Sequence, residues 1–355
     1  MDVAGPAGAP RLAADRVLVL RLGALGDVVR TRFAFPALRA LYPRAQIDWL
    51  VEDRAAAGLT GIVGLDRVVT LPRREMRPGR PVALARATRR ALRDLRDRRY
   101  DLAVDFHGIL KSALLARGAG IPQRVGYAAP LGREGSPALY THRVALGSDP
   151  LPRFERNAAL VRYLGGEPDG RVPPLDLPPD AGDGLGSLPE RFYVIHPGTS
   201  PGTSYKRWEE RRFAEVAARL AQHTGVPSLV TWGPVRGERE CAEQVVELSG
   251  DAARLAPETG SVAALLELLR RGTLFIGGDS GPMHLAALAG LPLVVVFGPT
   301  DPVENAPFDG SGLRVLRRDV GCNPCREGCP VRSCMAAVEA AEVAEAALEV
   351  LAARS

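Results

Sequence analysis

Long apolar runs are missing from this 355-residue sequence: no stretch of about 18 apolar residues occurs, the length that a membrane-spanning helix needs. The first fifteen residues are rich in Ala, Gly and Pro, and they lack the basic flank and apolar centre of a secretory signal peptide. We therefore expect no membrane span, a disordered lead over residues 1–15 and a cytoplasmic location. The length favours two domains over one.

Lysine is almost absent, since only Lys111 and Lys206 occur among 46 basic residues. Two lysines in an arginine-rich chain suggest places where a compact ammonium fits and a planar guanidinium does not, although chance survival also explains them. The net charge is +5, and eleven arginines against three acids lie between Arg73 and Arg99. This stretch is either a solvated helix face or a patch that approaches anionic lipid or phosphosugars.

The dinucleotide fingerprint G-x-G-x-x-G is also missing. The first glycine loop, Gly23-Ala-Leu-Gly26-Asp27, lacks the third glycine and places Asp27 where a pyrophosphate would lie. This argues against a nicotinamide-dependent oxidoreductase. A carboxylate at the start of a helix either caps that helix or faces a ligand as a general base, and both interpretations stay open for Asp27.

What the sequence does contain is an alternation of apolar strands and helices, which is typical of parallel sheets. Predicted strands are residues 16–21, 46–52, 67–71, 100–105, 192–196, 228–232, 274–277 and 292–297. Predicted helices include residues 27–41, 209–223, 282–289 and 335–353. We therefore predict an α/β fold of two Rossmann-like domains, residues 16–175 and 190–335, with parallel sheets facing a central cleft, and a C-terminal helix over 336–355. A Pro-, Gly- and Asp-rich segment, residues 165–189, is the predicted linker.

Two loops of the second half carry groups that suit an anion. Hydroxyls, glycine amides and two cations follow the strand 192–196, and together they predict an anion cradle: Thr199, Ser200, Lys206 and Arg207. The alternative is a flexible loop that caps a helix. After the strand 274–277, the backbone N–H groups of Ser280 and Gly281 would point at a phosphate, because Pro282 marks a first helical turn. His284, one turn later, is either structural or part of the site.

Five motifs in order resemble the bacterial lipopolysaccharide heptosyltransferases of glycosyltransferase family nine, from Arg16 to the final helix. The motifs are R-L-G-A-L-G-D-V-V at 21–29, D-F-H-G-I-L-K-S at 105–112, K-R-W at 206–208, G-D-S-G-P-M-H-L-A-A at 278–287 and V-F-G-P-T-D-P at 296–302. This resemblance implies a GT-B-like fold with the acceptor on the first half and an ADP-sugar on the second. It also implies an inverting, metal-independent transfer of heptose from ADP-heptose to Kdo or heptose of the lipopolysaccharide inner core.

The resemblance also assigns residues. Asp27 matches the catalytic base. Donor-binding positions are Thr199, Ser200, Lys206, Arg207, Glu238, Asp279, Ser280, Gly281 and His284, with Lys206 on the phosphate and Glu238 on the ribose. Acceptor-binding positions are Gly26, His107 and Lys111. A lipid-linked acceptor implies peripheral contact with the anionic inner face of the cytoplasmic membrane.

No D-x-D pair occurs in the chain, although transferases that hold a diphosphate through Mg²⁺ or Mn²⁺ usually need such carboxylates. We therefore expect catalysis without a cofactor. The alternatives are a family member with a different ADP-sugar or acceptor and, from the basic charge alone, a nucleic-acid-binding Rossmann-like protein. The latter is disfavoured because the arginine stretch lacks interleaved aromatics and no nucleic-acid-binding motif occurs.

Four of the five cysteines cluster as Cys322-x2-Cys325-x3-Cys329-x4-Cys334. Such spacing suits a structural zinc ion, but separated C-x-x-C knuckles would be more typical. Reduced thiols are the alternative, because a cytoplasmic location disfavours disulfides.

Overall fold

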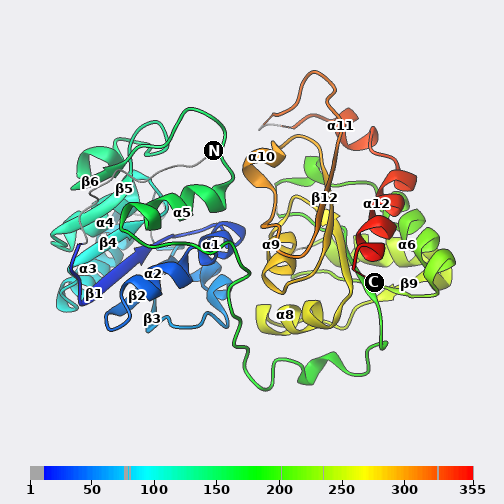
Figure 1. Cartoon of the computed structure of the whole chain (residues 1–355), viewed down its shortest axis with the longest axis horizontal. Coiled ribbons are helices and arrows are strands. Elements are labelled where there is room, and N and C mark those ends of the chain that lie inside the picture. Colours follow the sequence, from blue (N-terminus) through cyan, green and yellow to red (C-terminus); the bar gives the residue numbers. More distant parts are fainter. Residues whose placement is uncertain are drawn as a thin grey trace. The chain divides into compact units, whose positions relative to one another are not determined.

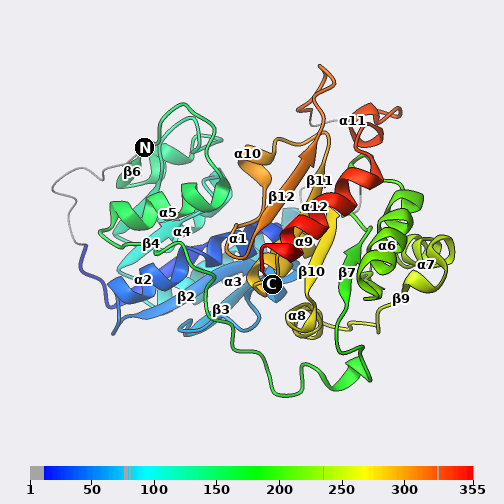
Figure 2. The same cartoon turned by 45° about the vertical axis from the view of Figure 1, so that its right-hand side comes forward.

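A computed structural model describes residues 12–75, 79, 81–200, 202–234, 236–325 and 328–354. The chain divides into two compact units, Met1–Asp176 and Leu177–Ser355. In the part of the chain that is described, no helix is both long and apolar enough to cross a bilayer. Each unit has its own six-stranded sheet (Figures 1 and 2).

The first sheet is parallel throughout, with the strand order β3-β2-β1-β4-β5-β6. Its strands are β1 (Arg16–Leu20), β2 (Gln46–Glu52), β3 (Arg67–Leu71), β4 (Leu102–Asp105), β5 (Gln123–Tyr127) and β6 (His142–Val144). The order reverses between β1 and β4, as in dinucleotide-binding folds. Ligands of such sheets bind beyond the carboxyl ends of the strands at this point.

Alternate residues of β1 divide the first unit into two apolar layers. Val17 and Val19 pack with α1 (Leu25–Arg32), α2 (Phe35–Leu41) and α5 (Arg153–Tyr163). Leu18 and Leu20 pack with α3 (Pro81–Asp97) and α4 (Leu110–Gly118) on the other face. This alternation is the period of two that a strand imposes. Because both faces of the sheet are covered, β1 reads as a continuous apolar run.

The second sheet repeats this topology, with the parallel order β12-β11-β10-β7-β8-β9 and a reversal between β7 and β10. Its strands are β7 (Tyr193–His196), β8 (Ser228–Val230), β9 (Ala253–Leu255), β10 (Leu274–Gly278), β11 (Leu293–Phe297) and β12 (Leu313–Arg317). Its helices are α6 (Glu210–Thr224), α7 (Glu238–Ser249), α8 (Val262–Arg271), α9 (Gly281–Leu288), α10 (Pro302–Asn305), α11 (Ser333–Ala336) and α12 (Ala340–Ala352). Short 3₁₀ turns complete the two units: η1 (Asp53–Leu59), η2 (Ser136–Leu139), η3 (Asp183–Leu185), η4 (Ser204–Lys206) and η5 (Gly250–Ala252).

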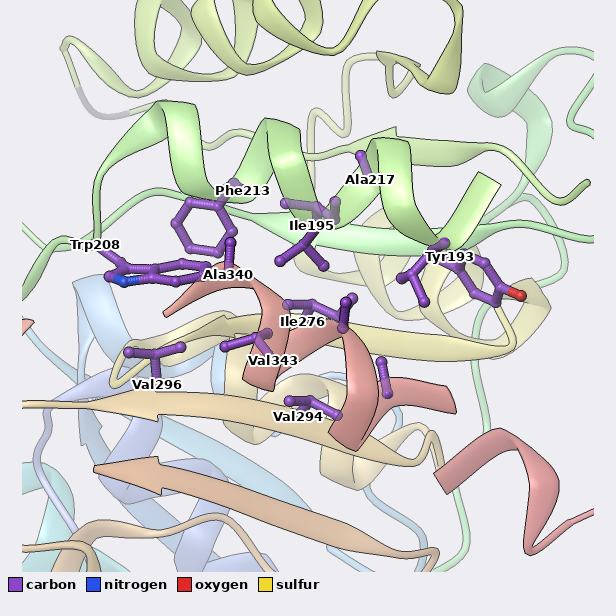
Figure 3. Packing of buried hydrophobic residues seen from close by; sticks show 14 of the residues in the cluster. Tyr193, Ile195, Trp208, Phe213, Ala217, Ile276, Val294, Val296, Ala340 and Val343 are labelled. Carbon is purple, nitrogen blue, oxygen red and sulfur yellow. The ribbon is translucent and has the colours of Figure 1, made fainter. Parts of the chain in front are cut away.

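One face of the second sheet buries a large aromatic and aliphatic core (Figure 3). Trp208 packs edge-on against Phe213 of α6, with ring centroids 4.9 Å apart. Its indole N–H donates to the carbonyl of Val338 at 3.2 Å. Val343 of α12 lies in the same core, so the last helix is an integral part of the second unit.

Two predicted helices are interrupted. The predicted helix 27–41 is α1 and α2, because Pro36 in the first turn of α2 cannot continue a helix through Arg32. The predicted helix 335–353 is α11 and α12, and α12 begins after Glu339. There Glu339 and Glu342 form a reciprocal capping box that starts a new helix.

The predicted disordered lead is wrong for residues 12–15, and residues 1–11 lie outside the described part. Tyr42 donates its hydroxyl proton to the Leu12 carbonyl at 3.0 Å. The N–H of Asp15 donates to Asp101, and its carbonyl accepts from Gln46. These bonds tie residues 12–15 to the first unit.

Candidate functional site

Two loops meet at the reversal point of the first sheet. Arg21, directly after β1, donates to the carbonyl of Phe106, directly after β4, at 2.7 Å. The backbone N–H of Leu22 donates to Nδ1 of His107 at 3.1 Å. The fold therefore brings His107 to the loop that leads into α1, whose first turn contains Gly26 and Asp27.

Three arginines surround the Asp27 carboxylate. Arg21 lies 2.5 Å from it, Arg30 pairs with it from the next turn of α1, and Arg153 of α5 lies at 4.0 Å. Burial by itself would raise the pKa of Asp27, but the three positive charges hold it well below its usual range. The N-cap of α1 is Ala24, and no side chain caps this helix. The capping alternative for Asp27 is therefore wrong.

Asp105 fixes the loop that carries His107. Its carboxylate accepts the backbone N–H groups of His107 and Gly108 and the hydroxyl of Tyr140. Burial raises the pKa of Asp105. Burial and the nearby Arg21 lower the pKa of His107 to about 3, so its ring is neutral at pH 7. Since Nδ1 accepts from Leu22, the ring proton resides on Nε2.

Lys111 pairs with a residue that sequence reasoning missed. Its ammonium lies 2.9 Å from Oε1 of Glu52, the last residue of β2. The same carboxylate lies 3.2 Å from Nε of Arg73. Glu52 ends a predicted strand at the edge where ligands of parallel sheets bind, and this position could have identified Glu52 as a site residue from the sequence.

At the reversal point of the second sheet, Asp279 is the common partner of two side chains. Lys206 Nζ lies 2.7 Å from its Oδ2, and the hydroxyl of Thr300 donates to the same oxygen at 2.8 Å. Asp279 follows β10 directly, and Ser280 is the N-cap of α9. Thr300 lies in the V-F-G-P-T-D-P motif at 296–302, but its side chain was assigned no role from the sequence.

Two buried hydroxyls near these strand ends lack hydrogen-bond partners among the described residues. Thr199 Oγ1 and Ser280 Oγ belong to side chains that are 3% and 7% exposed. Buried hydroxyls are normally paired, so each marks a place where a ligand or water would bind. Ser200 is exposed, and its carbonyl accepts from the Thr203 hydroxyl.

The other predicted donor residues have partners of their own. Arg207 donates to Sγ of Cys241 at 3.0 Å, whereas Lys206 pairs with Asp279. Glu238, at the start of α7, accepts the Gly233 N–H at 2.8 Å, and burial raises its pKa. Gly281 is the first residue of α9, and His284 is buried in that helix.

The four clustered cysteines differ in exposure. Cys322 and Cys329 are exposed, Cys325 is half-buried and Cys334 is buried. Within the described ranges, no group of three or more His, Cys, Asp or Glu side chains is arranged to hold a metal ion. The structural zinc stays a prediction, and elemental analysis of the purified protein would test it.

The sequence matches known glycosyltransferases over most of its length. The model of glycosyltransferase family 9 (heptosyltransferase) matches residues 88–334. Lipopolysaccharide heptosyltransferase 1 of Pseudomonas aeruginosa is 30% identical over 322 residues, covering 87% of this chain and 86% of that protein. Lipopolysaccharide heptosyltransferase 1 of Escherichia coli K12 is 27% identical over 297 residues, which cover 81% of this chain and 89% of that protein.

Solved structures agree in fold. E. coli heptosyltransferase WaaC with ADP gives a TM-score of 0.73 at 23% identity, covering 94% of this chain and 99% of that chain. The structure of E. coli ADP-heptose lipopolysaccharide heptosyltransferase II gives a TM-score of 0.74 at 22% identity, and the match covers 96% of this chain and 99% of that chain. The two six-stranded parallel sheets thus confirm the predicted GT-B-like, doubled Rossmann-like fold. The chain belongs to glycosyltransferase family 9 and is a glycosyltransferase.

Proposed function

We propose that this enzyme transfers heptose from ADP-heptose to a hydroxyl of Kdo or heptose in the lipopolysaccharide inner core, with inversion and without a metal ion. The observation that carries the donor half is the Lys206–Asp279–Thr300 cluster, together with the buried hydroxyls of Thr199 and Ser280, which lack partners among the described residues. Lipopolysaccharide heptosyltransferases from two organisms match most of this chain and support the acceptor class.

On the donor side, the chain offers positive charge where a diphosphate leaving group needs it. Lys206 supplies an ammonium, and the N-terminus of α9 presents the backbone N–H groups of Ser280 and Gly281. A diphosphate would compete with Asp279 for Lys206. The Thr300 hydroxyl would then remain as the partner of Asp279 and hold its carboxylate in place.

On the acceptor side, Asp27 would accept the proton of the attacking hydroxyl. The hydroxyl oxygen bonds to the anomeric carbon from the face opposite ADP, and the bond from that carbon to the phosphate oxygen breaks. Lys206 and the amides of α9 stabilise the charge that develops on the departing diphosphate. Neutral His107, held by Leu22, keeps an Nε2 proton available for an acceptor oxygen.

Product analysis tests this proposal. The enzyme is incubated with ADP-heptose and core acceptors that end in Kdo or in heptose, with and without EDTA. Product mass shows whether heptose was added, and the anomeric coupling constant shows inversion or retention. We expect an inverted product at an unchanged rate in EDTA. Transfer from another ADP-sugar only would contradict ADP-heptose as the donor. A retained configuration would contradict inversion, and loss of activity in EDTA would contradict a metal-independent reaction.

We further propose that α3 contacts the anionic inner face of the cytoplasmic membrane, where a lipid-linked acceptor lies. Four exposed arginines line one hollow with apolar Pro81 and Val82: Arg86, Arg89, Arg90 and Arg93. Val82 is 70% exposed, so the surface combines an apolar contact with positive charge. Each arginine near an anionic surface contributes about 1 kcal/mol, roughly fivefold in affinity.

Vesicle sedimentation tests this contact. We expect binding to phosphatidylglycerol vesicles, and the double variant Arg89→Gln/Arg93→Gln should weaken it by about 25-fold. Arg254→Gln, an exposed arginine of β9, serves as the control and should bind as the wild type does. Equal binding of the wild type to neutral phosphatidylcholine vesicles would contradict the proposal.

A further inference from the structure

Two buried arginines share the carboxylate of Asp27 among the described residues. Arg21 and Arg30 are 8% and 7% exposed, and both pair with this one carboxylate, which Arg153 also approaches. Even without Arg153, two buried guanidinium groups share a single negative charge. Since buried charges are normally paired, this arrangement leaves positive charge that an anion would neutralise.

Both buried arginines also keep N–H groups that are unpartnered among the described residues. These are Nε of Arg21 and both Nε and Nη1 of Arg30. A buried donor without an acceptor costs free energy, and guanidinium groups bind carboxylates and phosphates through paired N–H bonds. The surplus of charge and the surplus of N–H donors on these two side chains both indicate an anionic ligand.

We propose that Arg21 and Arg30 bind an anionic substituent of the acceptor sugar, a carboxylate or a phosphate, and that this binding releases the Asp27 carboxylate from its arginine partners. The inference rests on the proposed function, because it assumes a sugar acceptor at this loop. It goes beyond that function by making the anion a condition for efficient transfer. The acceptor would carry the anion within reach of both guanidinium groups, close to its reacting hydroxyl.

The consequence for Asp27 follows from its surroundings. While the arginines hold its pKa below the usual range, Asp27 is a weak base, and efficient bases have a pKa nearer the working pH. The groups that face it are Arg21 from the β1–α1 loop, Arg30 from its own helix, Arg153 from α5 and neutral His107 from the loop after β4. An anion on Arg21 and Arg30 would leave Arg153 as the remaining charged partner. Asp27 would then be a stronger base, so an anionic acceptor should raise kcat as well as lower KM.

Matched acceptors test the inference. One acceptor carries both carboxylate and phosphate, a second has the carboxylate converted to the carboxamide, and a third lacks the phosphate. We expect kcat/KM of the wild type to fall about 100-fold for the acceptor that loses the recognised anion, with part of the loss in kcat. The acceptor that suffers this loss identifies the anion. Equal kcat/KM within about threefold for all three would overturn the inference.

Variants locate the effect at the arginines. Arg30→Gln should reduce the preference for the charged acceptor to below about tenfold, while Arg30→Lys should keep more of it. Arg162→Gln, which removes an arginine of α5 that pairs with Glu155, should keep the full preference. Thermal melting of each variant shows whether it is folded. If Arg30→Gln does not fold, the preference of the wild type and of Arg30→Lys for the charged acceptor still tests the inference.

Equilibrium binding separates this inference from the proposed function. Calorimetric titration of the three matched acceptors into the wild type needs no transfer. Weaker binding of the acceptor that has lost the recognised anion, with the difference absent in Arg30→Gln, supports the anion site even if ADP-heptose is not the donor. Equal binding of all three acceptors overturns the anion site even if heptose transfer is observed.

Discussion

Replacing Lys206 with Met should weaken ADP binding more than any other single change in the second unit. The ammonium lies 2.7 Å from Asp279, and the two side chains are 18% and 13% exposed, so solvent screens them only in part. Two unit charges at about 4 Å interact by about 4 kcal/mol in an effective dielectric of 20. In Lys206→Met, the diphosphate loses this attraction and meets an Asp279 carboxylate that has lost its cation.

We therefore expect the Kd for ADP, measured by isothermal titration calorimetry, to rise by about 100- to 1,000-fold, which corresponds to roughly 3–4 kcal/mol. The double variant Lys206→Met/Asp279→Asn should bind ADP more tightly than Lys206→Met alone, because the unpaired carboxylate has been removed. Lys206→Arg keeps the charge but not the compact shape, and it should lose about tenfold. A Kd within about threefold of the wild type in Lys206→Met would refute the assignment of Lys206 to the donor phosphates.

Further expectations concern catalysis, positioning and stability. Asp27→Asn should lower kcat by about 100- to 10,000-fold with little change in the Kd for ADP, and unchanged kcat would remove Asp27 as the base. Thr300→Val removes the hydroxyl that donates to Asp279 and should weaken ADP binding by about fivefold, as seen by calorimetry. Trp208→Ala should lower the free energy of unfolding in urea by about 3–5 kcal/mol, whereas Val331→Ala at a 77% exposed position should change it by less than about 0.5 kcal/mol. Burial lowers the pKa of His196 to about 4, so the folded state binds fewer protons than the unfolded state. Stability should therefore be lost as pH falls from about 6.5 to 4, and His196→Gln should flatten this part of the urea-unfolding profile.

The strands could be predicted closely because buried parallel strands appear as short, continuous apolar runs. The predicted strands 46–52 and 67–71 coincide with β2 and β3. Strand β8 is shorter than predicted, since it ends at Val230 while Thr231 and Trp232 enter the loop beyond it. Helix ends were harder to predict, as Pro36 and the Glu339 capping box show. Both signals are short and local, and a longer apolar pattern on either side obscured them.

The partners of the site residues could be predicted only in part. Arg30 lies three residues after Asp27 on a helix, a spacing that brings side chains together. Arg21 and Arg153 reach the same carboxylate from a loop and from α5, which no local spacing indicates. The predicted anion cradle contained both neighbouring cations, Lys206 and Arg207, but only Lys206 pairs with Asp279, while Arg207 contacts Cys241.

The alternation of strands and helices was sufficient to predict the fold class, because this pattern depends on local geometry and burial. The missing long apolar runs argued against a membrane span, and the missing G-x-G-x-x-G argued against a nicotinamide-dependent oxidoreductase. The motifs indicated which loops carry polar chemistry. The tertiary structure decided which charges meet: three arginines on Asp27, Lys111 and Arg73 on Glu52, and Lys206 and Thr300 on Asp279. The physical reason is that the pairing of charges depends on distances of a few ångströms between segments far apart in the chain. Such distances exist only once the parallel strands have brought their carboxyl ends to one edge.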